Sequence, residues 1–125
     1  MLWHAGALLS LAVRGAAILG GRSCRQARAL ADAFMPLGMM FQLQDDVLDL
    51  YGDKGRGSCG SDLYEGKVSA LVVAHLERRP EDRERLLELL QTPREHTCPE
   101  RVSETIGRFV ESGALDAVLA EIQAL

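Results

Sequence analysis

Three aspartates stand close together in the middle of the sequence, directly after an apolar stretch. Asp45, Asp46 and Asp49 follow the residues "FQLQ", in a segment whose apolar positions recur at helical spacing. On a helix Asp45 and Asp49 share one face, and Asp46 lies about 100° around the axis. Like charges at this spacing destabilise a helix by about 0.2–0.5 kcal/mol, and near its C-terminal end they oppose the macrodipole. A bound cation would offset both effects.

Magnesium is the cation that best suits such carboxylates. Mg²⁺ prefers oxygen ligands, and proteins usually hold it with one or two carboxylates together with the phosphates of a substrate. The alternative is a helix end whose charges simply face water. A bare D-D-x-x-D pattern fits both interpretations, so the neighbouring residues have to separate them.

The residues on both sides of the aspartates help to choose between these two interpretations. Phe41 and Gln42 directly precede them, and the segment "GSDLYEGK" follows, ending at Lys67. A cation is unfavourable at the start of a helix, which favours a functional reason for Lys67. Gln42 could instead be an ordinary polar helix residue and Lys67 a surface charge. We expect Asp62 to cap the following turn.

Taken together, "FQLQDDVLDLYGD" and "GSDLYEGK" resemble the second aspartate-rich motif of the trans-isoprenyl diphosphate synthases, the polyprenyl synthetases. The resemblance spans nearly the whole chain, since "GALLSLAVRGAAILGG" resembles the helix before that motif. It implies an all-α, isoprenoid-synthase-type helical bundle with a deep apolar cavity. Residues 1–125 would form a partial polyprenyl synthetase domain, with about six helices of the larger fold.

The resemblance also implies a reaction and a set of residues. Mg²⁺ would bridge carboxylates to an allylic prenyl diphosphate, whose cation then alkylates isopentenyl diphosphate head to tail. The implied metal ligands are Asp45, Asp46 and Asp49, with Asp45 foremost. The implied catalytic residues are Asp45, Asp46 and Lys67. The implied substrate-binding residues are Phe41, Gln42, Lys67, Lys54 and Arg56.

The sequence departs from the family pattern in several places. The 125 residues hold one D-D-x-x-D motif, without the family's upstream motif and its arginine pair, and the last helices are also missing. His4 stands where the family has lysine, and Gly57-Ser58 replaces the usual Gly-Lys, so Lys54 or Arg56 would have to supply that charge. We therefore expect a chain that is inactive unless the missing segment completes it. The alternative is a non-catalytic binding or regulatory subunit that pairs with a full-length synthase.

Composition limits the partners and the location. The net charge of −4 and the pI near 5.3 exclude a basic nucleic-acid-binding stripe. Three widely spaced cysteines indicate reduced thiols in a cytoplasmic protein rather than a disulfide framework. Arg14 interrupts the apolar residues 1–20, which favours a helix of a larger fold, exposed in isolation, over a membrane span. The family habit implies a homodimer, or pairing with a complementing synthase chain.

Apolar periodicity and breaker residues predict helices almost throughout. Pro36 should kink or break the second helix, and Ser23 should cap it. A Gly-rich loop is expected over residues 51–62. The expected helices cover residues 2–19, 23–50, 67–79, 80–91, 99–113 and 114–125.

Overall fold

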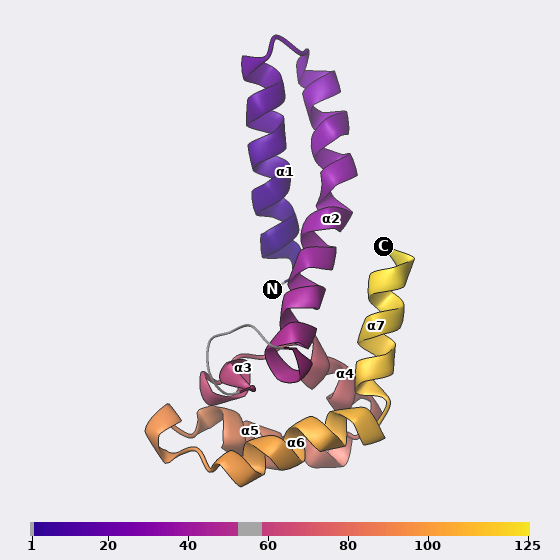
Figure 1. Cartoon of the computed structure of the whole chain (residues 1–125). Helices are drawn as coiled ribbons and strands as arrows, with labels where there is room; N and C mark the ends of the chain where they lie inside the picture. The colour runs from indigo at the N-terminus through magenta and orange to yellow at the C-terminus, as the bar shows by residue number, and fades with distance from the viewer. Residues whose placement is uncertain (1, 53–58) are drawn as a thin grey trace. The chain divides into compact units, whose positions relative to one another are not determined.

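The computed structural model describes residues 2–52 and 59–125, and within these ranges it contains helices and no strand. This confirms the all-α class (Figure 1). The α-helices are α1 (Leu2–Leu19), α2 (Cys24–Tyr51), α3 (Ser61–Tyr64), α4 (Ala70–Arg78), α5 (Arg83–Gln91), α6 (Pro99–Glu111) and α7 (Ala114–Ala124). Two 3₁₀ turns are η1 (Pro80–Asp82) and η2 (Arg94–His96).

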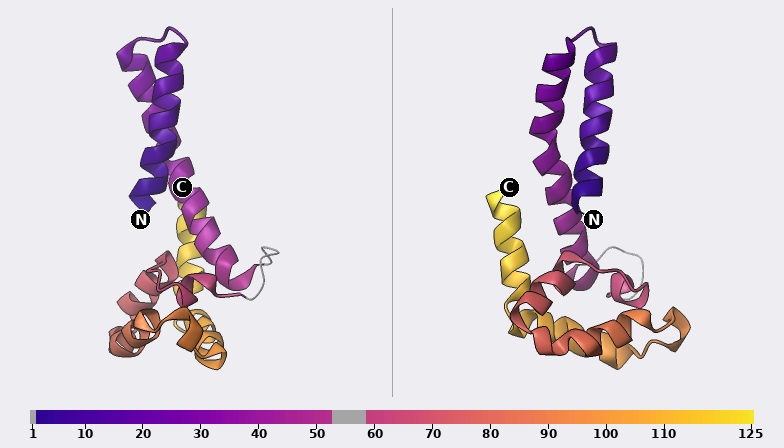
Figure 2. Two further views of the ribbon diagram at one scale, coloured as in Figure 1. Left: turned by 90° about the vertical axis from the view of Figure 1, so that its left-hand side faces the viewer. Right: turned by 180° about the vertical axis from the view of Figure 1, so that it is seen from behind.

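The described residues form two compact units, which we treat separately. The N-terminal unit holds the residues up to Gln44 together with Leu125, and the C-terminal unit holds residues 45–124. In the N-terminal unit α1 and the first part of α2 run antiparallel, side by side (Figures 1 and 2). The last two turns of α2, with the three aspartates, belong to the C-terminal unit.

The turn between α1 and α2 follows from its residue types. Gly21 adopts a left-handed φ of 83°, and the N–H of Arg22 reaches the carbonyl of Ala17 at 3.0 Å, which ends α1. Ser23 and Gln26 then exchange side-chain to backbone hydrogen bonds, each of 3.2 Å. This reciprocal pair is a capping box, and it confirms the predicted cap at the start of α2.

Helix α2 is continuous through Pro36, so the predicted possibility of a break is wrong. The residues on both sides of Pro36 are helical. The helix is therefore uninterrupted from Cys24 to Tyr51.

Glycine at position 38 allows α2 to approach α1 closely. A Cβ at Gly38 would lie 2.6 Å from the Cα of Gly6 and 2.7 Å from the carbonyl oxygen of Ala5. Gly38→Ala should therefore destabilise the protein by about 1–2 kcal/mol, because backbone has to move. Gly15→Ala is the matched control: nothing lies within 4 Å of its Cβ, so it should stabilise α1 by up to about 1 kcal/mol. Urea unfolding followed by circular dichroism measures both, and equal stabilisation by the two changes would contradict the close approach.

In the C-terminal unit, α4 packs against α6 and α7, and α5 packs against α3 and η1. Tyr51, the last residue of α2, donates a 2.7 Å hydrogen bond to the carbonyl of Ile106 on α6. Burial raises the pKa of Tyr51 to about 12, so the phenol stays a donor at any physiological pH. Buried apolar side chains of this unit are Leu50, Leu63, Leu71, Val72, Leu86, Leu89, Val102, Phe109, Ala114 and Val118.

Several apolar side chains of α1 face solvent in the 125-residue chain, as the sequence predicted. Leu8, Leu11 and Leu19 are 71%, 68% and 90% exposed. Among the residues that the structure describes, no helix combines the length and the apolar character that crossing a bilayer requires.

Candidate functional site

The three aspartates at the end of α2 lie in different surroundings. Asp46 is 1% exposed and Asp49 is 8% exposed, whereas Asp45 is exposed. A helix end whose charges all face water is therefore excluded for Asp46 and Asp49. Their buried carboxylates must be matched by donors from the same unit.

Both oxygens of Asp46 accept hydrogen bonds from the chain that follows the Gly-rich loop. Oδ1 accepts from the Lys67 ammonium at 3.1 Å, and Oδ2 accepts from the backbone N–H of Ala70 at 2.9 Å. Ala70 is the first residue of α4, and the Ser69 side chain caps the same helix end by accepting from Val72. Asp46 thus ties the end of α2 both to Lys67 and to the start of α4.

Asp49 fixes the start of α3 in a similar way. Its Oδ2 accepts from the backbone N–H of Asp62 at 2.9 Å, and its carbonyl accepts from the N–H of Gly60. The Asp62 carboxylate in turn lies 3.4 Å from the Lys67 ammonium. The prediction that Asp62 caps the following turn is wrong, since its side chain forms this ion pair and caps neither α3 nor α4.

A glycine sets the backbone next to Lys67. Gly66 has a left-handed φ of 72°, and a Cβ there would lie 2.4 Å from the carbonyl oxygen of Leu90 on α5. Only glycine fits both conditions. The N–H of Lys67 then bonds to the carbonyl of Asp62 at 2.9 Å, which closes the short connection between α3 and α4.

The cluster of Asp46, Asp49, Asp62 and Lys67 carries more negative than positive charge. Burial raises the pKa of Asp62 and the Asp49 carboxylate raises it further, although Lys67 partly counters this. Burial lowers the pKa of Lys67, but the hydrogen bond and charge of Asp46, together with Asp62, outweigh it and leave that pKa above its usual value. Lys67 is therefore an ammonium held among carboxylates.

The other predicted site residues are placed as follows. Phe41 is 57% exposed and Gln42 is partly exposed; both precede the aspartates on α2 but belong to the N-terminal unit. Lys54 and Arg56 lie outside the described residues. His4 is exposed on α1.

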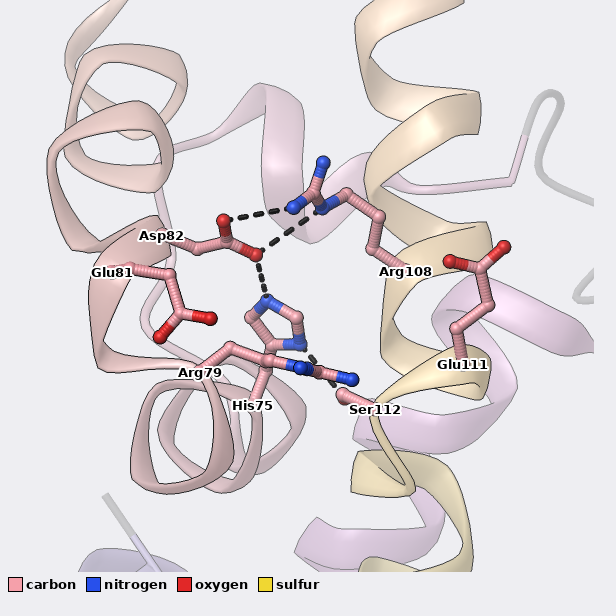
Figure 3. Close-up of a pocket in the computed structure, with 7 residues that line it drawn as sticks. All are labelled: His75, Arg79, Glu81, Asp82, Arg108, Glu111 and Ser112. Carbon is pink, nitrogen blue, oxygen red and sulfur yellow. Dashed lines mark hydrogen bonds and ion pairs between the residues drawn. The ribbon is translucent and has the colours of Figure 1, made fainter.

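A second polar cluster, which no sequence motif predicted, lies at the other end of α4. The His75 ring is 2.7 Å from Asp82 through Nε2 and 2.8 Å from the Ser112 hydroxyl through Nδ1. Arg108 donates two hydrogen bonds to Asp82, of 2.9 and 3.2 Å (Figure 3). The side chains line a pocket of about 200 Å³, which Arg79, Glu81 and Glu111 complete.

The second cluster joins helices rather than presenting a reactive group. Ser112, His75 and Asp82 are linked in the order of a nucleophile, base and acid. Arg108 neutralises Asp82, however, and the His75 side chain is only 3% exposed and packs on the Phe109 ring. The cluster therefore links α4, η1 and α6, and it lies apart from the aspartates along α4.

Comparison with known proteins identifies the fold. The polyprenyl synthetase family model matches residues 3–108. The chain belongs to the polyprenyl synthetase family. It is 40% identical over 114 residues to a short chain isoprenyl diphosphate synthase of Methanothermobacter thermautotrophicus, covering 88% of this chain and 34% of that protein. It is 30% identical over 123 residues to the farnesyl pyrophosphate synthase of Zea mays, covering 91% of this chain and 35% of that protein.

A solved structure supports the same assignment. The crystal structure of a geranylgeranyl pyrophosphate synthase matches with a TM-score of 0.78 at 27% identity, over 95% of this chain and 38% of that chain. The predicted isoprenoid-synthase-type bundle is therefore confirmed for the part of the fold that the chain covers. The chain spans about a third of the length of these relatives.

Proposed function

We propose that this chain binds an allylic prenyl diphosphate through Mg²⁺ and serves in its head-to-tail condensation with isopentenyl diphosphate. The observation that carries the proposal is an exposed carboxylate, Asp45, adjacent in sequence to the buried Asp46, which together with Asp62 holds the Lys67 ammonium. Membership of the polyprenyl synthetase family gives the reaction class.

The donor chemistry at the end of α2 fits magnesium. Mg²⁺ is commonly bound by one or two carboxylates, with phosphate oxygens and water as the remaining ligands. Asp45 offers an exposed carboxylate for such a site, whereas Asp46, Asp49 and Asp62 are engaged with Lys67 or with a backbone N–H group. Bound there, Mg²⁺ would supply positive charge to the departing diphosphate.

Lys67 is suited to hold the diphosphate of the substrate. A lysine ammonium has three donors, and in Lys67 two of them are directed to Asp46 and Asp62. The side chain is 24% exposed, so the third donor can reach an anion outside the cluster. Phe41, Gln42, Lys54 and Arg56 remain the predicted further contacts to the substrate.

The exposed leucines of α1 favour a second possibility, a non-catalytic subunit that pairs with a full-length synthase. Leu8, Leu11 and Leu19 offer an apolar surface to another chain. The same surface would serve a homodimer, or a complementing chain that completes the catalytic site. A cytoplasmic location and these partners remain predictions.

The binding proposal is tested at Asp45. Asp45→Ala should weaken Mg²⁺-dependent binding of inorganic pyrophosphate about tenfold to hundredfold, or roughly 1.4–2.8 kcal/mol, because it removes the exposed carboxylate. Isothermal titration of pyrophosphate with and without Mg²⁺ measures this. The matched control is Asp32→Ala, which removes a single exposed aspartate from the same helix and should leave binding unchanged. Equal affinity of the Asp45→Ala variant and the unaltered protein would refute the proposal.

A further inference from the structure

We propose that Asp46 is a positioning residue that holds Lys67 and the start of α4, and that it leaves the contact with the metal to Asp45. The role of Lys67 toward diphosphate rests on the proposed function above. The positioning of Lys67 itself rests only on the geometry of the C-terminal unit.

The surroundings of Asp46 suit a structural acceptor and not a ligand of a hydrated ion. Asp46 is 1% exposed, and its two carboxylate oxygens accept hydrogen bonds from the Lys67 ammonium and from the N–H of Ala70. Mg²⁺ requires six ligands in near-octahedral geometry and usually keeps several waters. A buried carboxylate with donors on both oxygens has no room for that shell, whereas Asp45, one residue earlier, is exposed.

Holding the side chain in place before a ligand binds benefits lysine more than it would benefit other cationic side chains. Its four-carbon side chain loses up to about 2 kcal/mol of rotamer entropy when it is fixed. Asp46 and Asp62 hold the Lys67 ammonium at 3.1 and 3.4 Å before any ligand binds, and Gly66 fixes the backbone beside it. Because the Lys67 side chain is already ordered in the free protein, binding an anion costs less conformational entropy. The affinity for the anion is therefore higher.

The aspartate motif therefore divides into two functions. Asp45 is exposed, and the proposed function places the metal there. Asp46 and Asp49 point inward, where they hold the first residues of α4 and α3 through the N–H groups of Ala70 and Asp62. The two connections keep Lys67, which lies between α3 and α4, at a fixed place relative to the last two turns of α2.

The sequence offers a direct test, because it contains only two lysines, Lys54 and Lys67. Competitive acetylation with acetic anhydride, read by mass spectrometry, gives the labelling rate of Lys67 relative to Lys54 within one molecule. Asp46→Asn should raise this ratio about fivefold or more, because it removes the strongest acceptor of the ammonium. Asp45→Asn, which removes the neighbouring charge, should leave the ratio unchanged. An unchanged ratio in Asp46→Asn would overturn the positioning role.

A second variant keeps the test decisive if Asp46→Asn does not fold. Asp62→Asn removes the longer of the two contacts to Lys67, and it should raise the ratio by a smaller factor. Circular dichroism of each variant shows whether the helices remain. If both asparagine variants keep their helices and label Lys67 as the unaltered protein does, the inference is wrong.

A double-mutant cycle separates positioning from metal binding. The variants Asp46→Asn, Lys67→Met and the double change are titrated with pyrophosphate in the presence of Mg²⁺. If Asp46 acts through Lys67, its substitution should change affinity less than twofold once Lys67 is methionine. Additive losses would overturn the inference and restore Asp46 as an independent ligand. Absence of Mg²⁺-dependent binding in every variant and in the unaltered protein would refute the proposed function, whereas the labelling ratios would still decide the positioning.

Discussion

Given Mg²⁺, an allylic diphosphate and isopentenyl diphosphate, the 125-residue chain alone is expected to release no elongated product. The chain carries one D-D-x-x-D motif, and the proposed site offers one exposed carboxylate and one positioned ammonium. Ionisation of an allylic diphosphate places charge on the leaving group that several cations must stabilise together. Incorporation of radiolabelled isopentenyl diphosphate into extractable product measures the reaction. Sustained turnover by the chain alone would contradict this prediction.

Addition of the family's upstream aspartate motif and its arginines in a second chain is expected to give catalysis. Co-expression with a segment of a related synthase that carries the upstream aspartate motif and its arginines is expected to give product. The control is the same pair with Asp45→Ala in this chain, which should lose that activity. Product formed equally well with Asp45→Ala would indicate that the partner supplies the whole site and that this chain acts as the non-catalytic subunit.

Much of the fold could be predicted from sequence because its determinants are local. The apolar periodicity, the Ser23 cap and the break at Pro80 predicted α1, α2, α4 and the later helices to within a few residues. Helix α3 was missed, since four residues in a Gly-rich segment carry no periodic signal. Pro36 was overestimated as a breaker, because α2 continues through it.

The candidate site could be predicted only in part. The spacing of the aspartates in the sequence predicted that Asp45 and Asp49 share one helical face. It does not predict which elements pack against that face. In the structure Asp46 and Asp49 are buried by α3 and α4, and Asp45 is not. The division of roles among the three carboxylates depends on these later elements, so it appears only when the chain is folded.

The second cluster illustrates the same limit and gives the largest expected effect on stability. Its residues lie up to 37 positions apart in sequence, so no motif links them. Asp82→Ala should lower the free energy of unfolding by roughly 2–3 kcal/mol at pH 7, because it leaves His75 and Arg108 without their acceptor. Glu81→Ala removes the same charge from the adjacent, exposed residue and should change stability by less than about 0.5 kcal/mol. Urea unfolding of the two variants measures the difference, and equal values would show that the cluster contributes nothing specific.

The pH dependence of this difference provides an independent check. The hydrogen bond with His75 lowers the pKa of Asp82, and Arg108 lowers it further, against the opposing effect of burial. Below the ordinary aspartate pKa of about 3.9 the unfolded chain therefore binds a proton that the folded chain does not. The stabilisation by Asp82 should be fully present above that value and should decline as pH falls through the lowered pKa of the folded state. The gap between the unaltered protein and Asp82→Ala is thus expected to narrow from pH 4 downward. A gap that stayed constant down to about pH 2 would mean that the Asp82 carboxylate is not the group that holds α4, η1 and α6 together.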